Sequence, residues 1–307
     1  GFLSLRQAEM LSLLNGHEAL TAGHRIPASE YRQAFECLFF EPTPANRQLF
    51  NKLLSASDIV VVGGRRFIPL DVVATALDTG IHSGNIRTRL FYETQPAGRR
   101  LPKLLQGKQV VKYWSCWDAP GAKFRYVDVD YVPDERRKGI GRGGKPSGKG
   151  EYWHFCGPVD NHHVPERLLM RQTEDEPFVG YIHQGSERIY TDNTLHTLLL
   201  TDRGRELGLS YRYLLAILNS AMMRRIYQAV AQEEGRTLAQ VKTTLVNRLP
   251  IPLPDDGEKR TLERMVGEIC GLYEKHGVPL AATAERRLAE LQACIDEAVA
   301  RMYGLDG

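Results

Sequence analysis

The stretch Ser210-Tyr-Arg-Tyr-Leu-Leu-Ala-Ile-Leu-Asn-Ser220 marks the point at which the chain changes from strand-like to helical periodicity. Ser210 is a favourable N-cap residue, and the apolar side chains after it recur every three or four positions, which predicts an amphipathic helix. The apolar face of that helix comprises Leu214, Ile217, Leu218, Ala221, Met222 and Ile226. Gly235 is its predicted end.

The sequence before this helix divides into two parts. Residues 63–206 contain short apolar runs separated by Gly, Pro, Asn and Asp, a pattern typical of strands joined by turns. The clearest predicted strands are Gln109 to Trp114, Phe124 to Val132, Val179 to Ile182 and Thr194 to Leu200. Residues 1–62 are expected to form a helical N-terminal extension or linker, since Leu3, Leu5 and Met10 begin a helical spacing, with a short strand from Ile59 to Val62 before Gly63.

The sequence after the helix predicts an extended segment and a pair of helices. Three alternating prolines in Arg248 to Pro254 exclude a helix there. Two amphipathic segments follow, one from Leu262 to Tyr273 and one from Leu288 to Leu305, and we expect an antiparallel helix hairpin. This hairpin is either a spacer toward another module or a cap on the core. Residues 207–307 are therefore the helical region, and the fold class is α+β: a β-rich domain followed by a helix and a C-terminal antiparallel helix hairpin.

Composition is that of an ordinary globular protein. Of 307 residues, 42% are hydrophobic and 25% are charged. No apolar run approaches the roughly 18 residues of a membrane span, and no signal-peptide pattern opens the chain, so we expect a cytoplasmic protein with no membrane partner. Five scattered cysteines without a C-x-x-C pair argue against a disulfide framework and a zinc ribbon.

Positive charge is concentrated in one segment. Between Asn85 and Lys149 there are fifteen Lys and Arg residues against six acids, which makes this segment +9 and the rest of the chain −6, although the whole chain is only +3. Eight aromatic residues are interleaved with these cations. Cations beside flat rings suit phosphate contacts and stacking on bases, although a solvated basic face has the same composition.

Three short motifs suggest other chemistry. The stretch Gly139 to Gly150 fits nucleotide-binding glycine patterns, but Gly150 follows Lys149 where a P-loop needs Ser or Thr, so a flexible basic loop is the better interpretation. His154, Cys156, His162 and His163 match no zinc spacing, and Cys156 beside His154 is a weak thiol-base pair. We therefore predict no catalytic residues and no metal ligands in this chain. A metal-dependent nuclease or hydrolase stays open as one alternative, and an assembly module acting through the C-terminal helices as another.

Seven segments form a recognisable series along the chain: Gly80-Ile-His-Ser-Gly84, Lys103 to Tyr113, Pro165 to Arg171, Tyr190-Thr-Asp-Asn-Thr194, Leu214 to Ser220, Leu249-Pro-Ile-Pro252 and Ile295 to Leu305. In this order they resemble the TaqI-like C-terminal specificity domain, the target-recognition region of adenine-specific DNA methyltransferases and of Type IIG restriction-modification enzymes. The glycine-rich insert Gly139 to Gly150 has no counterpart in the family. The catalytic tetrapeptides N-P-P-Y and D-P-P-Y do not occur in the sequence.

The resemblance implies a module that recognises double-stranded DNA sequence-specifically and directs N6-adenine methylation, with or without cleavage. The methyltransferase domain would lie on the same or a separate chain, so that this sequence is either a fragment or a stand-alone specificity subunit. S-adenosylmethionine, and magnesium for a nuclease domain, would belong to that parent protein. We expect no cofactor in this chain.

The expected DNA-binding residues fall into three groups. Cations beside the segments that resemble the family are Arg87, Arg89, Lys103, Lys108 and Arg125. Cations expected to form a mobile phosphate clamp are Arg136, Arg137, Lys138, Arg142, Lys145 and Lys149. The expected base readers are Asn85, Gln109 and Asn193, because amides can bond adenine through two hydrogen bonds.

Overall fold

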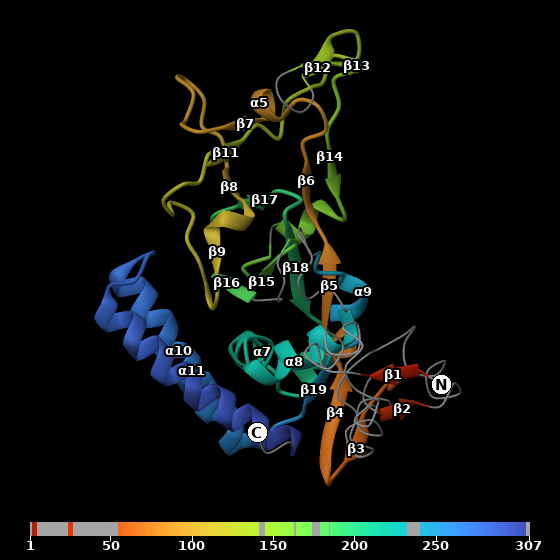
Figure 1. Cartoon of the computed structure of the whole chain (residues 1–307). Helices are drawn as coiled ribbons and strands as arrows, with labels where there is room; N and C mark the ends of the chain where they lie inside the picture. Colours follow the sequence, from red (N-terminus) through yellow and green to blue (C-terminus); the bar gives the residue numbers. More distant parts are fainter. Residues whose placement is uncertain are drawn as a thin grey trace, which may run out of the picture.

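The computed structural model describes residues 2–4, 24–26, 55–140, 145–162, 164–173, 179–183, 185–231 and 240–304. Short strands form the upper part of the molecule in Figure 1, and a larger sheet with helices forms the lower part. Two long C-terminal helices flank the lower part on one side. The structure is the α+β arrangement that the periodicity predicted.

A four-stranded antiparallel sheet lies at the centre of the described chain. Its strand order is β16 (Val179–His183), β15 (Glu166–Arg171), β18 (Leu195–Leu200) and β5 (Ala74–Asp78). The predicted strands at Val179 to Ile182 and Thr194 to Leu200 are thus confirmed.

The helix predicted after Ser210 is interrupted. The Ser210 Oγ accepts the Tyr213 N–H at 3.1 Å and begins α7 (Tyr211–Leu218), whose apolar side chains are buried. A second helix, α8 (Ala221–Ala231), starts after Asn219 and Ser220. The Asn219 amide bonds both the N–H and the C=O of Val179 at 3.0 Å, which ties the break to β16. Gly235, the predicted helix end, lies outside the described residues.

The extended C-terminal segment and the helix hairpin are present. Strand β19 (Pro250–Pro252) pairs antiparallel with β4 (Arg65–Pro69), which also pairs with β3 (Val60–Val62) across the turn at Gly63 and Gly64. Helices α10 (Asp256–His276) and α11 (Ala282–Tyr303) run side by side and lie along α7 (Figure 1). Their buried faces belong to the same apolar cluster as α7, β4 and β15, so the hairpin is a cap on the core.

The upper part is a smaller sheet with a separate core. Its order is β17 (Ile189–Thr191), β8 (Lys103–Leu105), β11 (Tyr126–Val127) and β7 (Phe91–Tyr92), and the β17–β8 pair is parallel. Strand β14 (His154–Cys156) pairs with β6 (Gly80–His82), and the short helix α5 (Arg87–Leu90) precedes β7. The buried apolar residues beneath this sheet are Ile81, Ile86, Leu90, Phe91, Leu104, Phe124, Val127 and Tyr190.

Two predicted strands differ from the structure. Gln109 to Trp114 is a tight turn: the 3-10 helix η1 (Gly107–Gln109) leads into β9 (Val110–Val111), and β10 (Trp114–Ser115) pairs back after Tyr113, whose φ is 69°. Of Phe124 to Val132 only β11 is a strand. The apolar pattern does not reveal the reversal at Tyr113. A non-glycine residue with a positive φ is uncommon, and Tyr113 adopts this conformation while its ring is packed in the core.

Short helices and an N-terminal strand pair complete the described chain. The helices are α4 (Leu70–Val73), α6 (Asp202–Glu206), α9 (Thr243–Val246) and the 3-10 helix η3 (Val159–His162). Strands β1 (Phe2–Ser4) and β2 (His24–Ile26) pair antiparallel, so Leu3 lies in a strand and not in a helix. The remaining residues of the expected helical segment up to 54 lie outside the described residues. Within the described chain, every helix is too short or too polar to cross a membrane.

Candidate nucleic-acid interface

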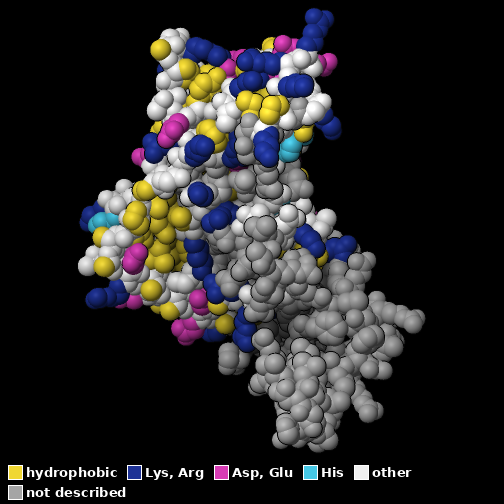
Figure 2. Space-filling model, turned by 45° about the horizontal axis from the view of Figure 1, so that its top comes forward, with side chains coloured by type: hydrophobic (Ala, Val, Ile, Leu, Met, Phe, Trp, Pro, Cys, Tyr) yellow, Lys and Arg dark blue, Asp and Glu magenta, His cyan; other side chains and the backbone are white. Residues whose placement is uncertain are grey.

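Basic side chains gather over the upper part of the molecule (Figure 2). Of the predicted clamp, Arg136, Arg137, Lys138, Lys145 and Lys149 are all exposed. The predicted contact residues Arg87 and Lys108 are exposed as well, and so are Arg100 and Lys123 from the same basic segment. Arg142 lies outside the described residues. The segment with net charge +9 therefore presents most of its described cations to solvent.

The described part of the glycine-rich insert is a hairpin and not the expected flexible loop. Strand β12 (Lys138–Ile140) pairs antiparallel with β13 (Pro146–Gly150). Lys138 faces Gly150 and Ile140 faces Pro146 across this pair. The sequence suggested mobility because of its glycines, but close packing requires two of them: a Cβ on Gly139 would overlap Asn85, and a Cβ on Gly150 would overlap the Glu135 carbonyl.

Asn85 and Glu151 fix the base of this hairpin. The Asn85 Nδ2 donates to the Gly150 carbonyl at 2.8 Å, its Oδ1 accepts the Tyr152 N–H at 3.1 Å, and its own carbonyl accepts the Ile140 N–H at 2.7 Å. A Cβ on Gly139 would overlap the Asn85 amide. Asn85 is 6% exposed, so its amide stabilises the hairpin and is not accessible for the predicted base contact in this conformation.

Glu151 interacts with four residues at the base of the hairpin. It is 2% exposed. Its Oε2 accepts hydrogen bonds from the Tyr131 hydroxyl at 2.7 Å and from the Asp134 N–H at 3.1 Å. Its Oε1 forms ion pairs with Arg89 and, at 3.6 Å, with Arg137. The Arg89 side chain is only 22% exposed. Arg89 is therefore paired with a buried carboxylate, and its predicted phosphate contact stays a prediction. The sequence contained no signal for the role of Glu151.

The other two predicted base readers differ in accessibility. Gln109 is fully buried: its Nε2 donates to the Trp117 carbonyl, and its Oε1 accepts the Gln106 N–H at 2.7 Å. It stabilises the turn after β8 and cannot reach a base in this conformation. Asn193 is half-buried, and its backbone N–H donates to Ile81, which leaves its side chain as the surviving candidate of the three.

Arg87 is held in a defined orientation. Its Nη2 lies 3.3 Å from the Asp192 carboxylate, and its guanidinium carbon lies 5.4 Å from the centres of both the Phe91 and Phe124 rings. Its side chain remains 44% exposed, whereas that of Asp192 is fully buried. A planar cation fixed in this way is suited to recognise a phosphate or a base edge.

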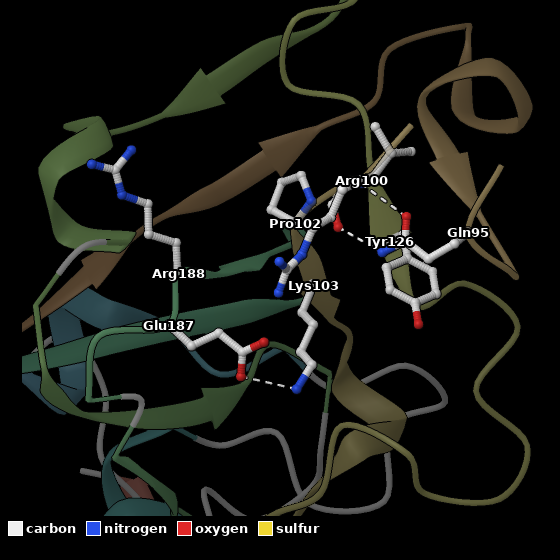
Figure 3. Close-up of a pocket in the computed structure, with 8 residues that line it drawn as sticks. Gln95, Arg100, Pro102, Lys103, Tyr126, Glu187 and Arg188 are labelled. Atoms are coloured by element: carbon white, nitrogen blue, oxygen red, sulfur yellow. Dashed lines mark hydrogen bonds and ion pairs between the residues drawn. The ribbon is translucent and has the colours of Figure 1, made fainter. Parts of the chain in front are cut away.

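Lys103 is the first residue of β8, and Arg125 precedes β11. The two cations flank Trp117, and we call this region the edge at Trp117. The Lys103 ammonium lies 4.6 Å and the Arg125 guanidinium 6.0 Å from the Trp117 ring centre. Lys103 also pairs with Glu187 at 2.9 Å beside a pocket of about 620 Å³, to which Arg100 and Arg188 contribute (Figure 3). This edge thus combines cations with an aromatic surface, the combination on which the prediction rested.

The histidine and cysteine residues do not assemble a metal site in the described chain. His154 stacks on His82 at 4.9 Å, and the Cys156 Sγ lies 4.0 Å from His154 Nε2. His162 is buried against Phe155 and Tyr190, and His163 lies outside the described residues. The described residues contain no group of three His, Cys, Asp or Glu side chains suited to hold a metal ion. Burial lowers the pKa of His82, and the nearby His154 lowers it further.

Residues 102–251 match the model of the TaqI-like C-terminal specificity domain. This match includes the edge at Trp117, the hairpin, the turn at Asp192 and α7. No curated protein matches the sequence.

Solved structures that are similar over parts of the chain come from restriction-modification systems. A Type IIL enzyme, MmeI, in complex with DNA is 16% identical, with a TM-score of 0.34 over 48% of this chain and 19% of that one. A type I R-M assembly is 11% identical, with a TM-score of 0.38 over 85% and 52%. The HsdS subunit from Thermoanaerobacter tengcongensis is 16% identical, with a TM-score of 0.33 over 83% and 51%. The chain spans about half or less of the length of these proteins.

Proposed function

We propose that this chain binds double-stranded DNA sequence-specifically, because residues 102–251 match the model of the TaqI-like C-terminal specificity domain. The observation that carries the proposal is the exposed basic face of the upper part, built on the hairpin β12–β13 and the edge at Trp117. Cations on such a face would neutralise backbone phosphates and supply most of the affinity. A few contacts to base edges would supply the specificity, and Asn193 is the candidate amide for them.

The recognised DNA would be presented to an N6-adenine methyltransferase, on the same or a separate chain. Methylation requires the target adenine to be flipped out of the duplex at a cost of a few kcal/mol, so the recognition module must hold the flanking DNA while the base is displaced. S-adenosylmethionine would bind to that methyltransferase, and magnesium to a nuclease domain where the system also cleaves DNA. A cytoplasmic location fits this role and stays a prediction.

The decisive test is a salt titration of binding to a pool of random-sequence duplexes. The test variant replaces Arg136, Lys138, Lys145 and Lys149 by Ala, and all four lie on the described parts of the hairpin region. We expect wild-type affinity to fall steeply with salt and the slope of log affinity against log salt to shrink by up to about 4 in the variant, at close to one unit per lost phosphate contact.

A matched control removes the same charge elsewhere. It replaces the exposed residues Arg260, Arg264, Lys275 and Arg286 of α10 and α11 by Ala. Its slope should equal that of the wild type. Equal losses in both variants would show attraction by net charge alone, and absence of binding by the wild type at low salt would refute DNA recognition by this chain. Selection of enriched duplexes from the bound pool then tests the sequence specificity.

A further inference from the structure

A second pocket on the basic part of the molecule has a lining suited to bind an anionic ligand. It has a volume of about 450 Å³ and lies between α5, η1, the loop 121–124 and the end of β15. Four cationic residues line it, Arg87, Lys108, Lys123 and Arg171, each from a different segment of the chain. Only the folded protein brings these charges together.

One acidic residue lines this pocket, Asp192, and it does not balance the four cations. Asp192 is fully buried, and its carboxylate accepts the Gln106 Nε2–H at 2.7 Å, the Thr194 N–H at 3.0 Å and the Thr194 hydroxyl. Its remaining contact is with Arg87 at 3.3 Å. The exposed ammonium groups of Lys108 and Lys123 have no acidic partner within the part of the chain that the structure describes. The pocket therefore keeps an excess of positive charge.

The cations of the pocket differ in their contacts. Arg87 is fixed by Asp192 through one nitrogen and by the rings of Phe91 and Phe124, which orients its planar fork. The Lys123 ammonium lies 5.3 Å from the centre of the Phe124 ring, and Lys108 is exposed. One oriented guanidinium and two ammonium groups around a small cleft suit the tetrahedral oxygens of a phosphate group.

We infer that this pocket binds a single phosphate of the DNA backbone, held jointly by Arg87, Lys108 and Lys123. Asp192 is then a positioning residue that orients Arg87. This inference rests on the proposed DNA recognition and adds one defined contact to it, in a pocket that no residue of β12 or β13 lines.

Sharing of one phosphate has a measurable consequence. Neutralisation of one phosphate contributes about 0.9 to the salt slope in duplex DNA. If three cations hold the same phosphate, their combined removal lowers the slope by about 1. If each cation meets its own phosphate, the combined removal lowers the slope by about 3.

The experiment compares Arg87→Ala, Lys108→Ala, Lys123→Ala and the triple variant in salt titrations on one duplex, each first shown to melt like the wild type. The control triple variant replaces Arg260, Lys275 and Arg286 by Ala. We expect Arg87→Ala to weaken binding about tenfold at low salt, and the triple variant to lose about 1 unit of slope. A loss near 3, or a slope equal to that of the control, would overturn the shared phosphate.

A double-mutant comparison tests the role of Asp192. Asp192→Asn should weaken DNA binding as Arg87→Ala does, and the double variant should bind no more weakly than Arg87→Ala alone. Additive losses would mean that Asp192 acts through the fold and not through Arg87.

Inorganic phosphate separates this inference from the proposed function. At low ionic strength, calorimetric titration should show phosphate binding to the wild type and none to the triple variant. Phosphate binding without any duplex binding would refute DNA recognition and leave an anion pocket. Duplex binding by the wild type with phosphate binding unaltered in the triple variant would refute the pocket alone.

Discussion

Gly139→Ala and Gly148→Ala, two substitutions in the same hairpin, are expected to change stability in opposite directions. A Cβ on Gly139 would overlap three atoms of the Asn85 amide, far inside the ordinary contact range of 3.4–4 Å, whereas a Cβ on Gly148 meets nothing within 4 Å. Neither glycine has a positive φ, so the backbone tolerates a side chain at both positions. Contact alone therefore separates the two variants.

The cost at Gly139 follows from the hydrogen bonds of Asn85. Its amide must move by about an ångström or more, which breaks the bonds to Gly150 at 2.8 Å and from Tyr152 at 3.1 Å. At about 1 kcal/mol for each buried bond, the hairpin base loses about 2 kcal/mol. Gly148→Ala should instead be neutral or stabilise by up to about 1 kcal/mol, because alanine restricts the unfolded chain.

Hydrogen exchange measures this difference locally. The Ile140 and Tyr152 amide protons, which bond to Asn85, should exchange about thirty times faster in Gly139→Ala and no faster in Gly148→Ala, since about 2 kcal/mol corresponds to that factor. Urea unfolding of both variants serves as the global control. Equal protection of these protons in the two variants would refute the packing argument.

Two further predictions concern the backbone at Gly80 and the buried thiol of Cys270. Gly80→Ala should lower the free energy of unfolding by about 3 kcal/mol in urea, because its φ is 113° and a Cβ would overlap the Asp192 carbonyl. The control Gly98→Ala, with φ 75° and open space around the Cβ, should lower it by only about 1 kcal/mol. Burial raises the pKa of the Cys270 thiol to about 11. The unfolded chain releases this proton first, near pH 9, so the free energy of unfolding should fall between about pH 9 and 11. Cys270→Ala should remove that part of the fall. An unchanged pH profile in the variant would contradict the assignment.

Regular elements with long-range apolar patterns were predictable from the sequence. The helix after Ser210, the extended Leu249-Pro-Ile-Pro252 and the C-terminal hairpin follow from capping, proline and periodicity. The break at Asn219 was not predictable, because it depends on hydrogen bonds to Val179, which lies in a distant strand. The reversal at Tyr113 was not predictable for a similar reason: the burial of its ring in the core, a tertiary contact, accompanies the left-handed conformation of its backbone.

The basic character of the candidate interface was predictable, but the role of each residue was not. Charge counting found Arg87 and Lys108 and could not tell them from Arg89, whose partner Glu151 is sixty-two positions later in the chain. Asn85 and Gln109 have the side-chain chemistry of base readers, but their amide groups form hydrogen bonds within the protein. Arg171 belongs to the second pocket and lies outside the basic segment, so no local signal marked it.

The sequence by itself determined the class of fold, the basic segment and the resemblance to a specificity domain, because periodicity, composition and motif order are properties of the chain alone. The tertiary structure decided which cations remain exposed, because burial and pairing depend on residues far apart in sequence. Asp192 orients Arg87, and Glu151 withdraws Arg89. Arg87 and Arg89, which only Thr88 separates, thus differ in exposure because the fold places different carboxylates beside them.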